Sequence, residues 1–160
     1  MTLKRYPVEP GKPKPGMVWD IKQPCKSCPY RKDSKLKLWH PSEFVNLLKQ
    51  DACIPGTDVS MGAMFGCHEY NKRPPETHRP CAGWLLDQKR RGLPNLNLRL
   101  TLSRNPLAAA CFEAVSSAGL KLFRTMVAMC RANGVRPPAS SVDPELAKAM
   151  EAIGVRVKPK

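Results

Sequence analysis

The chain has 160 residues and a formal net charge of +14, and its 42% hydrophobic content includes only 6% aromatic residues. These values predict one main domain with a modest core and a preference for anionic partners. No apolar run is long enough to span a bilayer, and the opening MTLKRYPVEPGKPKPG lacks the apolar stretch of a secretory signal. We therefore expect a cytoplasmic protein with no membrane partner.

Residues 1–24 are predicted to form a basic, Pro-rich arm. Five prolines alternate there with five Lys or Arg residues. Proline fixes φ and has no backbone N–H, so this segment favours an extended conformation over a helix.

Four cysteines have the spacing of a metal site: Cys25 and Cys28 in CKSC, Cys67 in FGCH and Cys81 in RPCAGW. The close pair would form one edge of the site and the two later cysteines the other. Thiols stay reduced in the cytoplasm, which favours metal ligation over disulfides. The set predicts one zinc ion. The proline after Cys28 and the wide later spacings keep one iron-sulfur cluster as the alternative.

His68 directly follows Cys67, and we expect it to donate to a sulfur from outside the ligand shell, with direct ligation as the alternative. His78 and Cys53 are weaker candidate ligands. A redox role for CKSC and a Cys67–His68 nucleophile are less favoured, because the surroundings supply no preceding apolar strand and no orienting group. The chain has no Gly-rich phosphate loop, HExxH helix or paired carboxylates, so the sequence favours a non-enzymatic role.

Two helices are predicted around the later cysteines. The first spans Pro41 to about Gln50, with Pro in its first turn. The second begins near Ala82 and ends at Gly92, with cations in its last turn. Residues 54–66 and 71–80 are predicted loops. The apolar or inward-facing positions of the two helices are Phe44, Leu47, Leu48, Trp84, Leu85 and Gln88.

The segment NLNLRLTL alternates Leu with polar residues from Leu96 to Leu102, which predicts a half-buried strand. The last third of the chain has helical patterns that end at Gly119, Gly134 and Gly154. We therefore expect three helices there, the last starting at Asp143–Pro144. We interpret Cys111 and Cys130 as ordinary core residues, because free cysteine behaves as a small hydrophobe.

These elements predict an α+β fold: a small domain organised by zinc or an iron-sulfur cluster, with a short strand element and a helical C-terminal part. The predicted boundaries are a basic arm over 1–24, a Cys-rich metal-binding domain over 25–104, a helical region over 105–154 and a basic tail over 155–160.

The positive charge is concentrated on both sides of the cysteines. Residues 1–40 hold ten Lys or Arg against three acids, and residues 71–104 hold eight against two. Such a surface attracts polyanions by releasing their counterions, and nucleic acid is the commonest of these. The residues predicted to contact phosphates are Arg31, Lys32, Lys35, Lys37, Arg73, Arg79, Lys89, Arg90 and Arg91.

The predicted function is therefore that of a metal-binding accessory or regulatory protein in transcription, which contacts nucleic acid or a nucleic-acid machine such as RNA polymerase. One alternative is a phage-type regulator that binds a host enzyme or host protein complex. Another is an iron-sulfur redox or sensing protein.

The segments CKSCPYRKD, FGCHEYNK, RPCAGWLLDQ and NLNLRL together resemble a family of small uncharacterised proteins from bacteria and their phages, marked by CxxCP, a later CH, and CxGW. The similarity covers about Pro24 to Leu102. It implies that fold-defining positions include the four cysteines, His68 and Trp84. The resemblance implies no activity.

Overall fold

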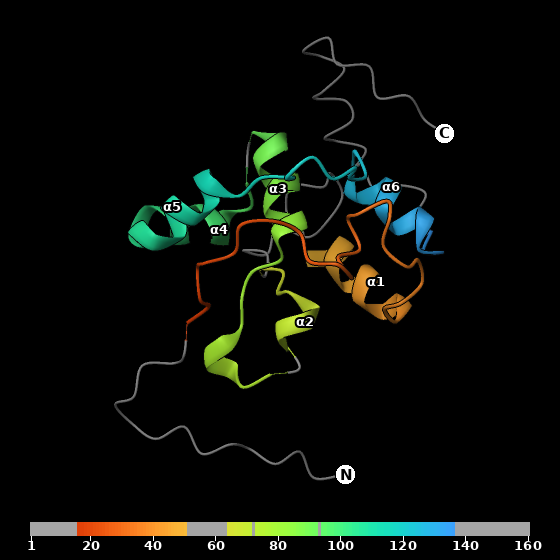
Figure 1. Ribbon diagram of the computed structural model, residues 1–160, viewed down its shortest axis with the longest axis horizontal. Helices are drawn as coiled ribbons and strands as arrows, with labels where there is room; N and C mark the ends of the chain where they lie inside the picture. Colours follow the sequence, from red (N-terminus) through yellow and green to blue (C-terminus); the bar gives the residue numbers. More distant parts are fainter. Residues whose placement is uncertain (1–15, 51–63, 72, 93, 137–160) are drawn as a thin grey trace.

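The structure is a computed structural model that describes residues 16–50, 64–71, 73–92 and 94–136. These residues form α1 (Pro41–Gln50), α2 (His68–Asn71), a 3-10 turn (Pro75–Thr77), α3 (Ala82–Arg91), α4 (Leu96–Arg104), α5 (Pro106–Ala114) and α6 (Met126–Ala132). In Figure 1, α3 lies near the centre, with α4 and α5 on one side and α1 and α6 on the other. No helix in these ranges has the length and apolar character needed to cross a membrane.

The predicted metal-organised α+β fold is wrong. The described residues are mostly helical, and their β structure is limited to two isolated antiparallel bridges, Arg31 with Leu122 and Gly66 with Pro80. Within the same residues, no group of three or more His, Cys, Asp or Glu side chains could hold a metal ion as arranged. Apolar packing between helices holds much of this part of the chain together.

The predicted strand over Leu96–Leu102 is instead helix α4. Asn95 caps its first turn, because the side-chain oxygen accepts a hydrogen bond from the Leu98 backbone N–H at 2.8 Å. Alternating leucines also place Leu98 and Leu102 four residues apart, on one helical face. Leu98 is fully buried and Leu102 packs against the core. The leucine pattern is compatible with the period of a strand and with that of a helix. The Asn95 cap and the good helix propensity of Leu favour the helix.

Helices α1 and α3 confirm two sequence predictions. The bounds of α1 are the predicted ones, with Pro41 as its first residue. Helix α3 ends at Gly92, whose φ of 72° is in the left-handed region that glycine adopts without strain. The side chains predicted to face inward are all buried: Phe44, Leu47, Leu48, Trp84, Leu85 and Gln88.

The C-terminal helices are shorter than predicted. Helix α5 ends at Ala114 and α6 begins only at Met126, after Thr125 accepts a hydrogen bond from the Ala128 N–H at 3.0 Å. The helix predicted from Asp143 lies outside the described residues, as do residues 1–15 of the predicted arm and the 155–160 tail.

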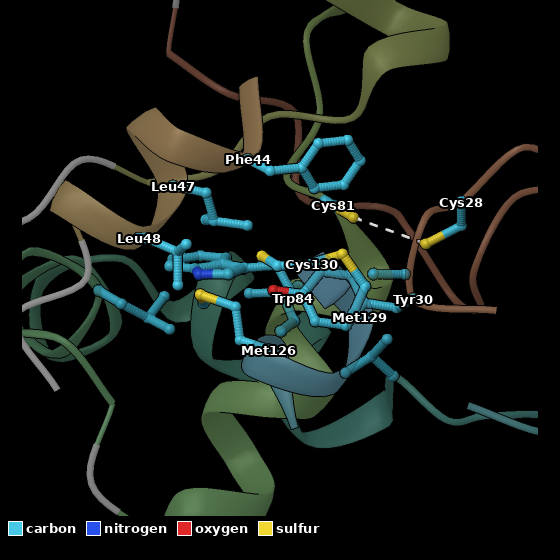
Figure 2. Packing of buried hydrophobic residues seen from close by; sticks show 14 of the residues in the cluster. Cys28, Tyr30, Phe44, Leu47, Leu48, Cys81, Trp84, Met126, Met129 and Cys130 are labelled. Carbon is cyan, nitrogen blue, oxygen red and sulfur yellow. Dashed lines mark hydrogen bonds between the residues drawn. The ribbon is translucent and has the colours of Figure 1, made fainter. Parts of the chain in front are cut away.

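The core joins both sides of the molecule around Trp84. Figure 2 shows Phe44, Leu47 and Leu48 of α1 facing Trp84 of α3, with residues of α6 beneath them. Cys130 is fully buried and Cys111 is 7% exposed, which confirms both as core residues. Burial raises the pKa of the Cys130 thiol to about 12, with a smaller effect from Asp87. Burial also raises the pKa of the Cys111 thiol, so both cysteines are weak nucleophiles in the folded protein.

Candidate metal centre

The four predicted ligands come together from three separate segments. Consecutive turns shape the first, where the Cys28 N–H donates to the Cys25 carbonyl at 3.1 Å. The other two segments pair through the Gly66–Pro80 bridge, in which the Cys67 N–H donates to the Arg79 carbonyl at 2.8 Å. Cys67 therefore lies opposite Arg79 and Cys81 opposite Phe65, which makes the two cysteines diagonal neighbours across the bridge, although fourteen positions separate them in the sequence.

The sulfur atoms meet in two close pairs. Cys28 Sγ lies 3.8 Å from Cys81 Sγ, a contact drawn as a dashed line in Figure 2, and Cys67 Sγ lies 3.9 Å from Cys25 Sγ. A tetrahedral ion with Zn–S bonds of about 2.3 Å separates neighbouring sulfurs by about 3.8 Å. Each pair therefore has the spacing of one edge of a zinc tetrahedron, although the four side chains do not form a complete binding group as arranged.

The two pairs also interact with each other. The pKa of Cys25 is lowered because Cys28 and Cys67 donate hydrogen bonds to its sulfur, with a smaller contribution from Ser27. The pKa values of Cys28 and Cys67 are raised, mainly because each thiol donates a hydrogen bond to the Cys25 thiolate. The next largest cause is a hydrogen bond with Cys81 for Cys28, and burial for Cys67. The group thus favours a thiolate on Cys25, the least buried of the four.

Gly83 is a site residue whose role the sequence analysis did not assign. A Cβ at this position would lie 2.6 Å from the Tyr30 Cβ and 2.7 Å from the Cys28 sulfur. Only glycine permits this close approach of α3 to the CxxC turn. The sequence feature that could have indicated this role is the CxGW motif, in which Gly83 lies two positions after the candidate ligand Cys81.

His68 packs between aromatic rings beside the thiols. Its ring is stacked on Trp39 at a centroid distance of 4.3 Å, and its Nε2 lies 3.5 Å from a Glu43 carboxylate oxygen. Its Nδ1 is buried and has no hydrogen-bond partner in the described part of the chain. The contacts described for His68 are thus to aromatic rings and a carboxylate, and its donation to a sulfur stays a prediction.

Several of the cations predicted to contact phosphates are already engaged within the protein. Arg31 pairs with Asp33, Arg79 with Asp20, and both Arg90 and Arg91 with the buried Asp87. Lys89 donates to the backbone carbonyls of Phe112 and Glu113 at the end of α5. These partners give such residues a structural role, because a buried carboxylate such as Asp87 requires compensating charge.

Three other predicted cations, Lys32, Lys35 and Lys37, are exposed beside the CxxC turn. Within the described residues they form no ion pair; the Lys32 ammonium lies 6.0 Å from the centre of the Phe123 ring. Arg73 is also exposed, and its guanidinium lies 4.9 Å from the centre of the Tyr70 ring. The available positive surface is therefore smaller than the predicted set of nine.

Residues 20–149 match the model of a family described as "Family of unknown function (DUF6283)". The match covers most of the chain, so the protein belongs to this uncharacterised family. The match also extends across the predicted domain boundary at residue 104. Asn105, at this boundary, is both the C-cap residue of α4 and the N-cap residue of α5. No curated protein and no solved structure matches the chain significantly.

Proposed function

We propose that Cys25, Cys28, Cys67 and Cys81 bind one zinc ion. The observation that carries this proposal is the pair of sulfur contacts, at 3.8 and 3.9 Å. These distances fit thiolates that share a single ion. They argue against a [4Fe-4S] cluster, whose four thiolates bind four different irons and lie farther apart. A [2Fe-2S] cluster also holds two thiolates on each iron, so the metal and sulfide content distinguishes it from zinc. A movement that brings the two pairs together would complete a tetrahedral shell.

The proposed zinc has a structural rather than a catalytic role. Four thiolate ligands leave no open position for water or substrate. Cys81 also precedes α3 as its N-cap residue, so the positive end of that helix faces the negative charge that a zinc-thiolate group carries. A reducing compartment such as the cytoplasm keeps these thiols available for zinc.

Metal analysis tests the proposed ligands. Protein purified without oxygen is expected to contain one zinc per chain and to be colourless. A brown protein with iron and acid-labile sulfide would instead support the iron-sulfur alternative. Protein without either metal, even after reconstitution under reducing conditions, would contradict the proposed site.

We further propose that the zinc-bound protein contacts nucleic acid, alone or within a machine such as RNA polymerase. The support is the net charge of +14 and the exposed lysines on either side of Cys25, Lys22 and Lys26. Binding to single- and double-stranded DNA and RNA would be measured by fluorescence anisotropy from low to physiological salt. We expect log K to fall linearly with log salt; absence of binding even at low salt would exclude this function.

A protein partner is the second candidate, because Leu36 and Leu38 are exposed at 43% and 42% on either side of Lys37. Large apolar side chains at such exposure are typical of contact surfaces when they cluster. Capture of a stoichiometric host protein by the tagged chain, unchanged after nuclease treatment and reduced by L36S/L38S, would favour this alternative over direct nucleic-acid binding.

A further inference from the structure

A cleft of about 700 Å³ opens beside Cys25, on the side of the metal centre that reaches the surface. This volume is in the range of small-molecule binding sites. Its lining combines cationic side chains with an apolar wall: Lys22, Lys26, Arg31 and Arg79, and Ile21, Pro24 and Tyr70.

The two arginines of this cleft are held in place by the protein. Arg79 donates to the Asp20 carboxylate at 2.7 Å and to the Thr77 carbonyl at 3.0 Å, and its guanidinium lies 4.3 Å from the centre of the Tyr70 ring. Arg31 donates to Asp33 and, at 3.4 Å, to the Cys25 backbone carbonyl. These contacts fix the position of both charges before any ligand binds, which lowers the entropic cost of binding.

The two lysines supply the charge that the carboxylates do not neutralise. Lys22 and Lys26 are exposed and form no ion pair with any described residue. Four cations against the carboxylates of Asp20 and Asp33 and the Cys25 thiolate leave a net charge of about +1 at the cleft. An open, positively charged cleft with apolar walls suits a ligand that has both a phosphate and a planar ring.

We propose that this cleft binds one phosphate-bearing nucleotide unit, as a free nucleotide or within a single strand of nucleic acid. Lys22 and Lys26 contact the phosphate, while the base lies against the apolar wall that Tyr70 completes. The cleft thereby gives the proposed nucleic-acid function a specific place and a preference for single strands. Its arginines, Arg31 and Arg79, belong to the nine predicted contact residues, but its lysines, Lys22 and Lys26, do not.

The test compares two charge-matched double variants of the full-length, zinc-loaded protein. K22Q/K26Q removes the cleft lysines, and K35Q/K37Q removes two exposed lysines that do not line the cleft. Binding is measured with a labelled single-stranded oligonucleotide of about ten nucleotides, and with AMP and adenosine as competitors. We expect K22Q/K26Q to bind at least about fivefold more weakly, with a salt slope reduced by about 1.4, and K35Q/K37Q to change affinity less than about twofold.

Competition and metal content complete the test. AMP should displace the oligonucleotide and shift the backbone amide NMR signals of residues 21–23, 25 and 26, and adenosine should do so much less. Equal losses in both double variants, or zinc loss from K22Q/K26Q, would overturn the cleft assignment. Zinc loss would mean that Lys22 and Lys26 stabilise the charge of the zinc-bound thiolates rather than bind a phosphate. If K22Q/K26Q binds the oligonucleotide as well as wild type, the cleft is not the binding site, but the proposed nucleic-acid function stands. If the protein binds AMP but no oligonucleotide, the nucleic-acid function is refuted and nucleotide binding in the cleft stands.

Discussion

The segments that carry the four cysteines contain little regular structure, whereas the buried residues around Trp84 come mainly from helices α1, α3, α4, α5 and α6. Turns and single backbone hydrogen bonds between distant segments place the thiols. Side-chain burial holds the helices together. The two regions meet where α3 begins, since Cys81 caps the helix and Trp84 lies one turn further along it. The helices thus build the core and the turns position the thiols, although two of these thiols, Cys28 and Cys81, also belong to the core.

The largest effect is expected from Trp84→Ala. Trp84 is 1% exposed at the centre of the core, so its truncation should lower the free energy of unfolding by about 3 to 5 kcal/mol. Chemical denaturation measures this change. Leu107→Ala is the control, because Leu107 is 72% exposed and its loss should cost almost nothing. Similar costs for the two variants would contradict the position of the core.

Gly83→Ala is expected to disturb both regions at once. The added methyl group would collide with Tyr30 and with the Cys28 sulfur, and such overpacking costs about 1 to 3 kcal/mol. Zinc affinity should fall as well, because Cys28 must move. A competition titration with a chromophoric chelator measures that affinity. Gly16→Ala is the matched control, since nothing lies within 4 Å of the Cβ it would add; unchanged zinc affinity in Gly83→Ala would argue against the close contact.

Cys81→Ser and Cys111→Ser separate metal binding from packing. Cys81→Ser should lose zinc and cost about 1 to 3 kcal/mol, because a hydroxyl replaces a buried sulfur. Its helical circular dichroism should persist, since the helices also pack through the apolar core around Trp84. Cys111→Ser should keep zinc and cost under about 1 kcal/mol, because serine can still donate to the Ile21 carbonyl as the thiol does at 3.3 Å. Full zinc retention in Cys81→Ser would exclude Cys81 as a ligand.

The smallest effect concerns pH and the exposed pair of Asp20 with Arg79. The hydrogen bond from Arg79 lowers the pKa of Asp20 below its ordinary value of 3.8. A lowered carboxylate pKa stabilises the fold above that value, and this contribution is lost as the pH falls through the folded-state pKa. Asp20→Asn should therefore cost about 0.5 kcal/mol at pH 6, relative to wild type, and progressively less as the pH falls below 3.8 through the folded-state pKa. A difference that does not shrink as the pH falls would mean that the carboxylate charge is not its cause.

The sequence predicted local features of this protein better than it predicted their packing. Helices α1 and α3 were predictable because Pro41 and Gly92 mark their ends and their apolar residues repeat at helical spacing. The leucines of α4 fitted two periods equally well, and the deciding interaction, the Asn95 cap, is a matter of backbone geometry. The predicted α+β fold class was wrong because it depended on the strand assigned to residues 96–102 and on the assumption that a metal organises the domain.

The candidate site divides in the same way. The cysteine spacing was enough to predict which four thiols come together, because a CxxC pair with two distant single cysteines is typical of a metal site. Charge patterning placed the cations in the sequence but not their partners. Asp20 lies 59 positions from Arg79, and Lys22 and Lys26 gain importance only from the cleft that Arg79 and Tyr70 complete. Pairings over such sequence distances depend on the tertiary fold.

X-ray absorption at the zinc edge, on protein purified without oxygen, tests the central claim most directly. We predict one zinc per chain, bound by four sulfur atoms at about 2.3 Å, and the loss of that signal in Cys81→Ser. A shell with fewer than four sulfurs, or a protein that cannot be loaded with zinc, would contradict the assignment of Cys25, Cys28, Cys67 and Cys81 as one metal site.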